Sequence, residues 1–204
     1  MFIRTAFLAA AAVVALSASA FAVPIAASSQ FNISGFNIGL GGASIDTATG
    51  LDFTGSSFVP SPGVAGVVDS AVGSGIGSFA GLTCNSNCGT IKDIPAFIGF
   101  APLTNFYNTT VGVSFDLNTL SVTSRIPATA NSLATLIISG TGTFHYSTFD
   151  ATPGVFTLTS QGGNITTFSA STIAQTVAAP EPASMAILGA GLAGLGLLRR
   201  RRQG

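Results

Sequence analysis

Short alternating runs of polar and apolar residues fill the region from Val23 to Ala179, and they constrain the fold more than any other feature. Ser, Thr, Asn and Gly alternate there with Phe, Val, Ile and Leu. Successive side chains of a β-strand point to opposite faces, so the alternation predicts strands with one apolar and one polar face. No stretch in this region approaches the ~20 apolar residues that a helix needs to span a bilayer.

Charge is scarce in this chain. Asp, Glu, Lys and Arg make up 7% of its 204 residues, against roughly 25% in a typical soluble domain. Between Val23 and Ala179 the cations are Lys92 and Arg125, and six aspartates make the region mildly acidic. Nucleic-acid binding needs clustered Lys and Arg to neutralise phosphates, so we expect no nucleic-acid partner. The composition is that of a β-rich extracellular protein.

VGVSFDL and LSVTSRI give the clearest strand patterns. A two-residue turn at Asn118-Thr119 would pair Leu117 with Leu120 and keep the apolar residues of both segments on one face. The pattern therefore predicts a hairpin, in which Asp116 marks the end of the first strand.

A second hairpin is predicted where GVFTLTS and ITTFSAS flank QGGN. A three-residue loop at Gly162–Asn164 pairs Leu158 with Phe168, whereas a two-residue Gly-Gly turn would mismatch the faces, so we expect the longer loop. Just before this hairpin, LATLIIS and GTGTFHYSTF predict two more strands, followed by a turn at Asp150–Gly154.

The first half of the region is less regular. FNISGFNIGL predicts a strand that bends near Gly35, and LDFTGSSF a short strand with a turn. The Gly-rich VAGVVDSAVGSGIGSFAGL is compatible with tightly packed short strands or with a long loop. We predict an all-β fold for residues 23–177, an antiparallel, jelly-roll-like β-sandwich of about seven to ten strands that buries one face of each strand.

The first 22 residues have the three parts of a secretory signal peptide. Arg4 supplies the positive charge, Ala6 to Leu16 form an apolar stretch, and Ala20-Phe21-Ala22 is an A-x-A cleavage site. The pattern predicts a signal helix, export by the Sec machinery and cleavage by signal peptidase before Val23. Cleavage after Ala20 is the local alternative.

The other end of the chain has an apolar stretch followed by a basic cluster. Residues 183–198 contain no charge and predict a transmembrane helix that rises roughly 24 Å, which Ala178 and Ala179 can extend. The cluster that follows consists of four arginines, which the positive-inside rule holds in the cytoplasm, so the body lies outside. These arginines are Arg199, Arg200, Arg201 and Arg202.

Pro180, Glu181 and Pro182 precede this helix, and the order of motif, helix and arginines resembles the PEP-CTERM sorting signal over residues 178–204. The strand-rich region just before the tail is also similar to that of many proteins with this signal. The resemblance implies a Gram-negative bacterial protein whose tail is recognised and removed by an exosortase-type membrane protease. It also implies a setting of exopolysaccharide and biofilm. A permanent tail anchor is the alternative, which the Pro-Glu-Pro triplet disfavours.

Cys84 and Cys88 are the only cysteines. In an exported chain, two cysteines most often form a disulfide, which here would staple a small loop. A metal site needs further ligands, and no histidine lies nearby in the sequence, so we expect no metal. The three-residue spacing also disfavours a redox role.

Few residues point to catalysis. His145 is the only histidine, and its context TFHYS predicts a position on a strand surface. No G-x-S-x-G elbow accompanies it, and no D-x-D-x-D-G calcium loop is present. GIGSFA, at Gly75–Ala80, matches a loose dinucleotide pattern without the βαβ context that the motif requires. We therefore expect neither catalytic residues nor a cofactor.

These features predict a non-enzymatic, exported protein of the cell surface or extracellular matrix, with exopolysaccharide as a candidate partner. A carbohydrate-binding or adhesin module is the main alternative. The absence of Trp and the presence of only Tyr107 and Tyr146 leave few stacking platforms for sugar rings. A secreted hydrolase is disfavoured by the single histidine and by the lack of a recognisable carboxylate pair.

Overall fold

The computed structural model describes residues 22–55, 59–147, 149–163, 166–176 and 191. The signal segment and the helix expected at residues 183–198 lie outside this part of the chain, apart from Ala22 and Gly191. Among the described residues, no helix is long and apolar enough to cross a membrane. The prediction of an all-β body is confirmed, because ten strands and one short 3-10 helix make up its regular structure.

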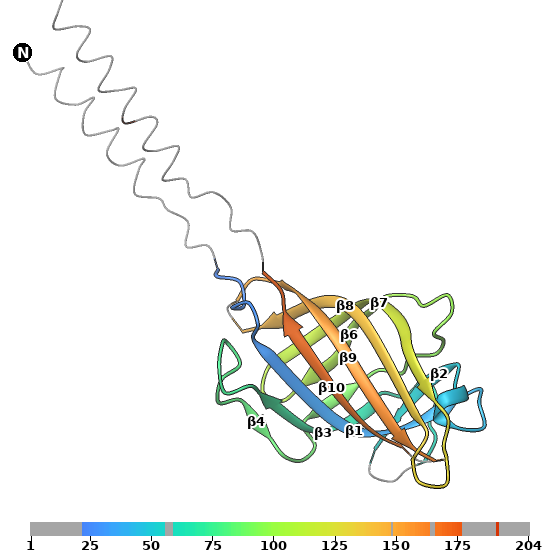
Figure 1. Ribbon diagram of the computed structural model, residues 1–204. Helices are drawn as coiled ribbons and strands as arrows, with labels where there is room; N and C mark the ends of the chain where they lie inside the picture. Colours follow the sequence, from blue (N-terminus) through green and yellow to red (C-terminus); the bar gives the residue numbers. More distant parts are fainter. Residues whose placement is uncertain (1–21, 56–58, 148, 164–165, 177–190, 192–204) are drawn as a thin grey trace, which may run out of the picture.

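The strands alternate in direction and join into one sheet (Figure 1). Their bounds are β1 Gln30–Leu40, β2 Gly50–Thr54, β3 Gly66–Gly73, β4 Thr83–Cys84, β5 Gly89–Ile91, β6 Leu103–Thr109, β7 Val113–Ile126, β8 Thr135–Tyr146, β9 Thr152–Gly162 and β10 Thr166–Ala174, with the 3-10 helix η1 at Ile45–Thr47.

The sheet closes on itself, so the predicted sandwich is wrong. Its strand order is β2-β1-β10-β9-β8-β7-β6-β5-β3-β4, and a further pairing joins β1 to β3. The eight strands other than β2 and β4 thus form a closed barrel. One edge of β1 serves two partners, since Phe31–Gly35 pair with β3 and Phe36–Leu40 pair with β2. The register of β1 against β3 shifts between Ser34 and Gly35, which confirms the bend expected there.

The predicted hairpin at Asn118-Thr119 is also wrong. These residues, and Asp116 before them, lie inside β7, a continuous strand of 14 residues. The register against β8 shifts between Leu117 and Thr119, at a β-bulge. A bulge adds one residue to one strand and moves the buried face from odd to even positions. A two-residue turn would produce the same switch in the sequence pattern, which explains the error.

β8 likewise joins two segments that the sequence divides. LATLIIS and GTGTFHYSTF belong to one strand of 12 residues, with Gly140 and Gly142 in its middle. These glycines do not form a turn. They let the backbone of β8 approach that of β7 closely. A Cβ at Gly142 would lie 1.9 Å from the carbonyl oxygen of Asp116 and 2.4 Å from the ring of Phe115. Only glycine lets β8 pass this close to β7.

The β9–β10 hairpin has the predicted loop length but a different register. Gly162 pairs with Thr166, so three residues, 163–165, separate the strands. Leu158 therefore faces Ala170 rather than Phe168. The loop starts one residue later than predicted. This moves the pairing by two positions, so the buried residues of β9 still lie opposite buried residues of β10. The turn expected at Asp150–Gly154 is shorter, because β9 already begins at Thr152.

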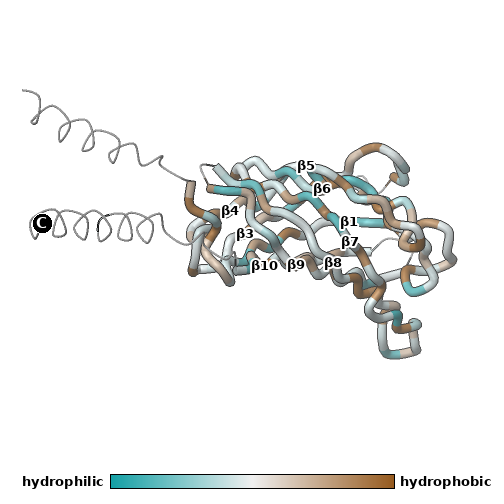
Figure 2. The backbone as a smooth tube through the Cα atoms, turned by 90° about the horizontal axis from the view of Figure 1, so that it is seen from above, coloured by the Kyte–Doolittle hydropathy of each residue, from teal (hydrophilic) through white to brown (hydrophobic). Residues whose placement is uncertain are grey.

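Aromatic side chains fill the inside of the barrel. Phe115 packs edge-on against Phe144 with ring centroids 5.1 Å apart, and Phe53 packs against Phe168 at 5.0 Å. On β9 and β10 buried residues alternate with more exposed ones. Figure 2 shows hydrophilic and hydrophobic residues mixed along the strands. The largest buried rings belong to Phe31, Phe53, Phe79, Phe106, Tyr107, Phe115, Phe144 and Phe156.

Both ends of the described body leave the barrel from the same end (Figure 1). The amide of Ser28 donates to the carbonyl of Ala174 at 2.9 Å, so the chain entering β1 lies beside the chain leaving β10. The described chain therefore enters and leaves the barrel at the same end.

Candidate functional site

The residues predicted for sorting lie outside the described part of the chain, as does Ala20. They are Pro180, Glu181, Pro182, Arg199, Arg200, Arg201 and Arg202. Ala22 and Val23 are described, and Val23 is 67% exposed. Its carbonyl accepts a hydrogen bond from the amide of Asp150 at 3.1 Å. Signal-peptide cleavage before Val23 stays a prediction, at a position that the fold leaves on the surface.

The disulfide predicted between Cys84 and Cys88 is present, with Cα atoms 5.6 Å apart. It joins the end of β4 to the residue before β5, and both strands pair with β3. Asn87 has a φ of 50°, which closes the small loop. Cys88 is buried and belongs to the hydrophobic core, so the disulfide holds β4 and β5 beside β3.

His145 lies on the outer face of β8, as predicted. Its Nε2 is 2.9 Å from Oδ2 of Asp116 on β7, and the side chains are 45% and 23% exposed respectively. The other carboxylate oxygen of Asp116 accepts a hydrogen bond from the amide of Asn105 at 2.6 Å. Among the described residues this pair meets a backbone amide and no serine hydroxyl, so the geometry is that of a surface ion pair.

GIGSFA, the loose dinucleotide pattern, lies between β3 and β4. The chain that follows it leads into a strand rather than a helix, so the structural context of a phosphate-binding turn is missing in this segment. The amide and hydroxyl of Ser78 instead bond to Ser29 and Ala26 beside β1. The segment closes the end of the barrel near the chain ends.

Uncharged polar side chains form continuous rows across the outside of five neighbouring strands. One row runs across β1, β10, β9, β8 and β7, and a parallel row is polar apart from Ile137. Gln30 reinforces the first row by donating to Ser171 at 2.9 Å. The first row consists of Asn32, Ser171, Thr157, Ser139 and Ser121, and the second of Ser34, Ser169, Thr159, Ile137 and Ser124. We call these ten residues the hydroxyl face.

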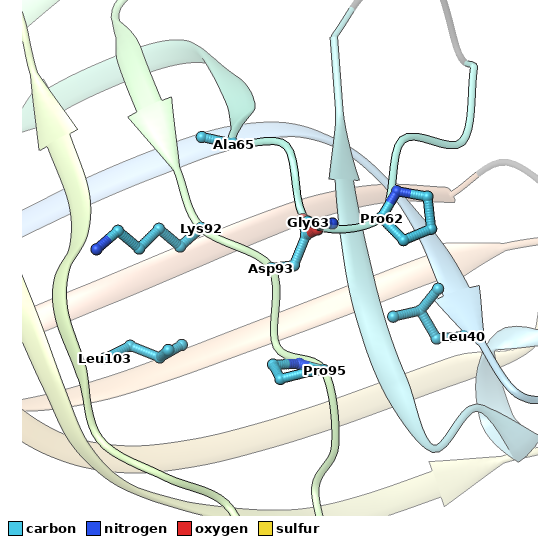
Figure 3. A pocket seen from close by; sticks show the side chains of 8 residues that line it. All are labelled: Leu40, Pro62, Gly63, Ala65, Lys92, Asp93, Pro95 and Leu103. Carbon is cyan, nitrogen blue, oxygen red and sulfur yellow. Dashed lines mark hydrogen bonds between the residues drawn. The ribbon is translucent and has the colours of Figure 1, made fainter.

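An open groove lies on another side of the barrel, where the segment after β5 passes β2. Its volume is about 360 Å³, and Figure 3 shows the carboxylate of Asp93 directed toward Gly63. Asp93 accepts hydrogen bonds from the amide of Gly63 at 2.7 Å and from the amide of Phe53 at 2.9 Å. The lining is mostly apolar and consists of Leu40, Pro62, Gly63, Ala65, Lys92, Asp93, Pro95 and Leu103.

A second carboxylate, Asp52, is fully buried on β2 near this groove. One of its oxygens accepts a hydrogen bond from the amide of Ser61 at 2.9 Å. Burial raises the pKa of Asp52 above its ordinary value, the Ser61 amide lowers it, and the negative charge of Asp93 raises it further. In the sequence Asp52 looks like an ordinary polar residue of a short strand. No motif near it indicates that the segment around Ser61 covers it.

Comparison with known proteins identifies the tail. Residues 178–202 match the family model described as the PEP-CTERM protein-sorting motif. The chain carries a PEP-CTERM sorting motif. Such a motif implies exosortase-dependent sorting and export to the cell surface. No curated protein and no solved structure matches the chain.

Proposed function

We propose that this PEP-CTERM protein is a non-enzymatic component of the cell surface or extracellular matrix, associated with exopolysaccharide. The helix at residues 183–198 anchors it transiently in the inner membrane, and an exosortase-type protease then releases it. The observation that carries the proposal is the sorting motif at residues 178–202. It directs to the cell exterior a barrel whose interior is occupied by its own aromatic side chains.

The hydroxyl face supports a polysaccharide partner. Its Ser, Thr and Asn side chains supply both donors and acceptors and carry no charge, which suits the hydroxyl groups of a neutral sugar polymer. Ring stacking contributes little, because Tyr107 is buried and Tyr146 is half-buried against Phe149, with centroids 5.6 Å apart. Contact with a matrix polymer therefore rests on many hydrogen bonds spread over the surface.

The groove beside Asp93 favours a second candidate, a carbohydrate-binding module that takes one or two sugar units. Its open apolar walls with one carboxylate match the general form of a small-ligand site. Co-sedimentation with exopolysaccharide from the producing culture separates the two. Leu103→Asp in the groove abolishes binding under the module hypothesis and leaves it intact if the hydroxyl face is the contact.

The sorting part of the proposal is tested by replacing Pro180, Glu181 and Pro182 with alanine. Membrane insertion is expected to persist, because the apolar stretch and the four arginines remain. Release to the cell exterior is expected to fail, and full-length chain accumulates in the inner membrane. Deleting the processing protease gives the same result in the unmutated protein.

A matched control replaces Gln175, Thr176 and Val177, the three residues just before the motif region, with alanine. Release of this variant should match that of the unmutated protein. Normal release of the Pro-Glu-Pro variant would refute motif recognition and leave a permanent tail anchor as the function of the segment.

A further inference from the structure

Two side chains of β2, those of Asp52 and Thr54, face neither the solvent nor the barrel core. Leu51 and Phe53 face inward, and Phe53 packs against Phe106 and Phe168 with centroids 5.9 and 5.0 Å away. Asp52 and Thr54 alternate with them and therefore project from the other face of the strand. That face is also covered, because Asp52 is 0% and Thr54 is 2% exposed.

Two oxygens on this covered face have no hydrogen-bond partner. They are Oδ1 of Asp52 and Oγ1 of Thr54. The residues are two positions apart on one face, about 7 Å along the strand, so the two side chains can reach one point between them. Native proteins pair nearly all buried polar atoms, and two unpaired oxygens from neighbouring side chains therefore indicate a ligand that both can bind.

A second carboxylate faces the same segment of the chain. Asp93 holds the amide of Gly63, and Asp52 holds the amide of Ser61, two residues earlier. Both carboxylates thus accept hydrogen bonds from the Ser61–Gly63 segment. Besides burial, the negative charge of Asp93 raises the pKa of Asp52.

Neither cation of the described body neutralises these charges. The ammonium of Lys92 donates to the carbonyl of Thr104 at 2.7 Å. The guanidinium of Arg125 donates to the carbonyl of Asp46 and lies 5.5 Å from the ring centroid of Phe97. Among the described residues, the one ion pair is that of His145 with Asp116, so Asp52 and Asp93 lack a cationic side chain.

Protonation alone does not satisfy Asp52. As a carboxylate, its Oδ1 needs a donor or a cation, and as an acid it needs an acceptor. The protein supplies neither to this oxygen. A bound cation satisfies Oδ1, accepts the hydroxyl oxygen of Thr54 as a ligand and offsets the charge of both carboxylates.

We propose that Asp52, Thr54 and Asp93 form a calcium site that fastens the Ser61–Gly63 segment onto β2. Carboxylate and hydroxyl oxygens are hard ligands, and Ca²⁺ accepts six to eight oxygens at about 2.3–2.6 Å in irregular geometry. Mg²⁺ requires a stricter octahedral arrangement and gives up its waters reluctantly, which favours Ca²⁺ at a site that is buried from solvent. Calcium sites of extracellular modules bind with Kd of about 10⁻⁴–10⁻³ M, the range expected here.

The test measures Ca²⁺ binding and thermal unfolding on the exported protein after treatment with a chelator. Equilibrium dialysis with radioactive Ca²⁺ should show one saturable site. With a Kd of about 1 mM, 10 mM Ca²⁺ raises the ratio of folded to unfolded protein about 11-fold. For a body of this size the corresponding rise in Tm is about 3–6 °C.

Variants assign the site to its residues. Asp52→Asn should lose both binding and the rise in Tm, and Thr54→Val should weaken binding several-fold. Asp150→Asn removes the same charge from an exposed position and should behave as the unmutated protein. If Asp52→Asn does not fold, Asp93→Asn provides the second carboxylate variant, with the same loss of binding expected.

Three results would overturn the proposal. Absence of saturable Ca²⁺ binding at 10 mM would show that these oxygens do not form a calcium site. An equal rise in Tm with Mg²⁺ at the same ionic strength would show general screening of negative charge. Binding by Thr54→Val and Asp52→Asn as tight as that of the unmutated protein would place the ion elsewhere. Each readout is made on purified protein, so it is independent of whether sorting proceeds as proposed.

Discussion

The inner and outer sides of the same strands differ in what they require of the sequence. On β9, Phe156 and Leu158 are fully buried, whereas Thr157 between them is exposed. Phe156 touches Phe106 and Phe115, with ring centroids 5.3 and 6.2 Å away. Thr157 lies beside the small polar Ser139 and Ser171. A side chain inside the barrel must therefore have a particular volume and shape, whereas a side chain outside it needs only to be polar and to favour a strand.

This difference separates the fold from the function. The inner side decides whether the barrel forms, because its aromatic rings fill the space that closure creates. The outer side is free to vary in detail without unfolding the protein, and so it is the side on which a matrix contact can be built. Substitutions on the two sides should therefore change different measured quantities.

Phe156→Ala is expected to have the largest effect on stability. It removes a fully buried ring and leaves a cavity, which costs about 3–5 kcal/mol of unfolding free energy. Urea denaturation of the exported protein measures this cost. Thr157→Ala, one residue away on the other side of the strand, is the control. Equal losses for the two variants would contradict the division between the inner and outer sides.

Gly142→Val should come next, with a loss of about 3 kcal/mol, the upper end for overpacking. Its side chain would meet the backbone of Asp116 and the ring of Phe115 across the β7–β8 pairing. Gly163→Ala is the matched control, since an added Cβ there has no heavy atom within 4 Å. Thermal unfolding of both variants tests whether the glycines of β8 are required for close approach.

Reduction of the Cys84–Cys88 disulfide should cost about 2 kcal/mol or less, because a ring this short removes little entropy from the unfolded chain. The measurement is the shift in urea midpoint after reduction and alkylation under non-denaturing conditions. The loss should be confined to the strands that the disulfide joins, and hydrogen exchange should increase at β4 and β5. Increased exchange across β8–β10 would show that the staple supports the whole barrel.

Substitutions on the hydroxyl face should have the smallest effect on stability. Thr157→Val combined with Thr159→Val removes one exposed and one half-buried hydroxyl, keeps the β-branched shape and changes the unfolding free energy by about 0.5 kcal/mol or less. Co-sedimentation with exopolysaccharide should fall, because the polar row is interrupted. Unchanged co-sedimentation would remove this face from the proposed contact.

Much of the secondary structure could be predicted from alternation alone. The β9–β10 hairpin shows why, since a three-residue loop keeps Leu158 and Ala170 on the buried side. The disulfide was predictable because the chain has only two cysteines, four positions apart. The sorting motif was predictable because its three parts are contiguous.

Closure and the β2 site were not predictable, because neither leaves a local signal. The bulge near Thr119 changes which face of β7 is buried, and a turn would change the sequence pattern in the same way. Gly142 suggests the end of a strand in the sequence, but in the structure it permits close approach of β8 to β7. The proposed calcium site is likewise absent from any linear motif. A search for a D-x-D-x-D-G loop cannot find Asp52 and Asp93, which come together only when the segment after β5 pairs with β2.

The pairing of β1 with β10 also sets the order of events during biosynthesis. Phe31 pairs with Thr172, so the first strand of the barrel waits for the last one before the ring can close. Protein chains are made from the N-terminus, and non-local β-pairings form slowly, over milliseconds to seconds. Thr172 precedes the sorting motif at residues 178–202 by only a few positions. The barrel can therefore close only after β10 has been made, so a chain truncated before β10 would have neither a closed barrel nor the sorting motif.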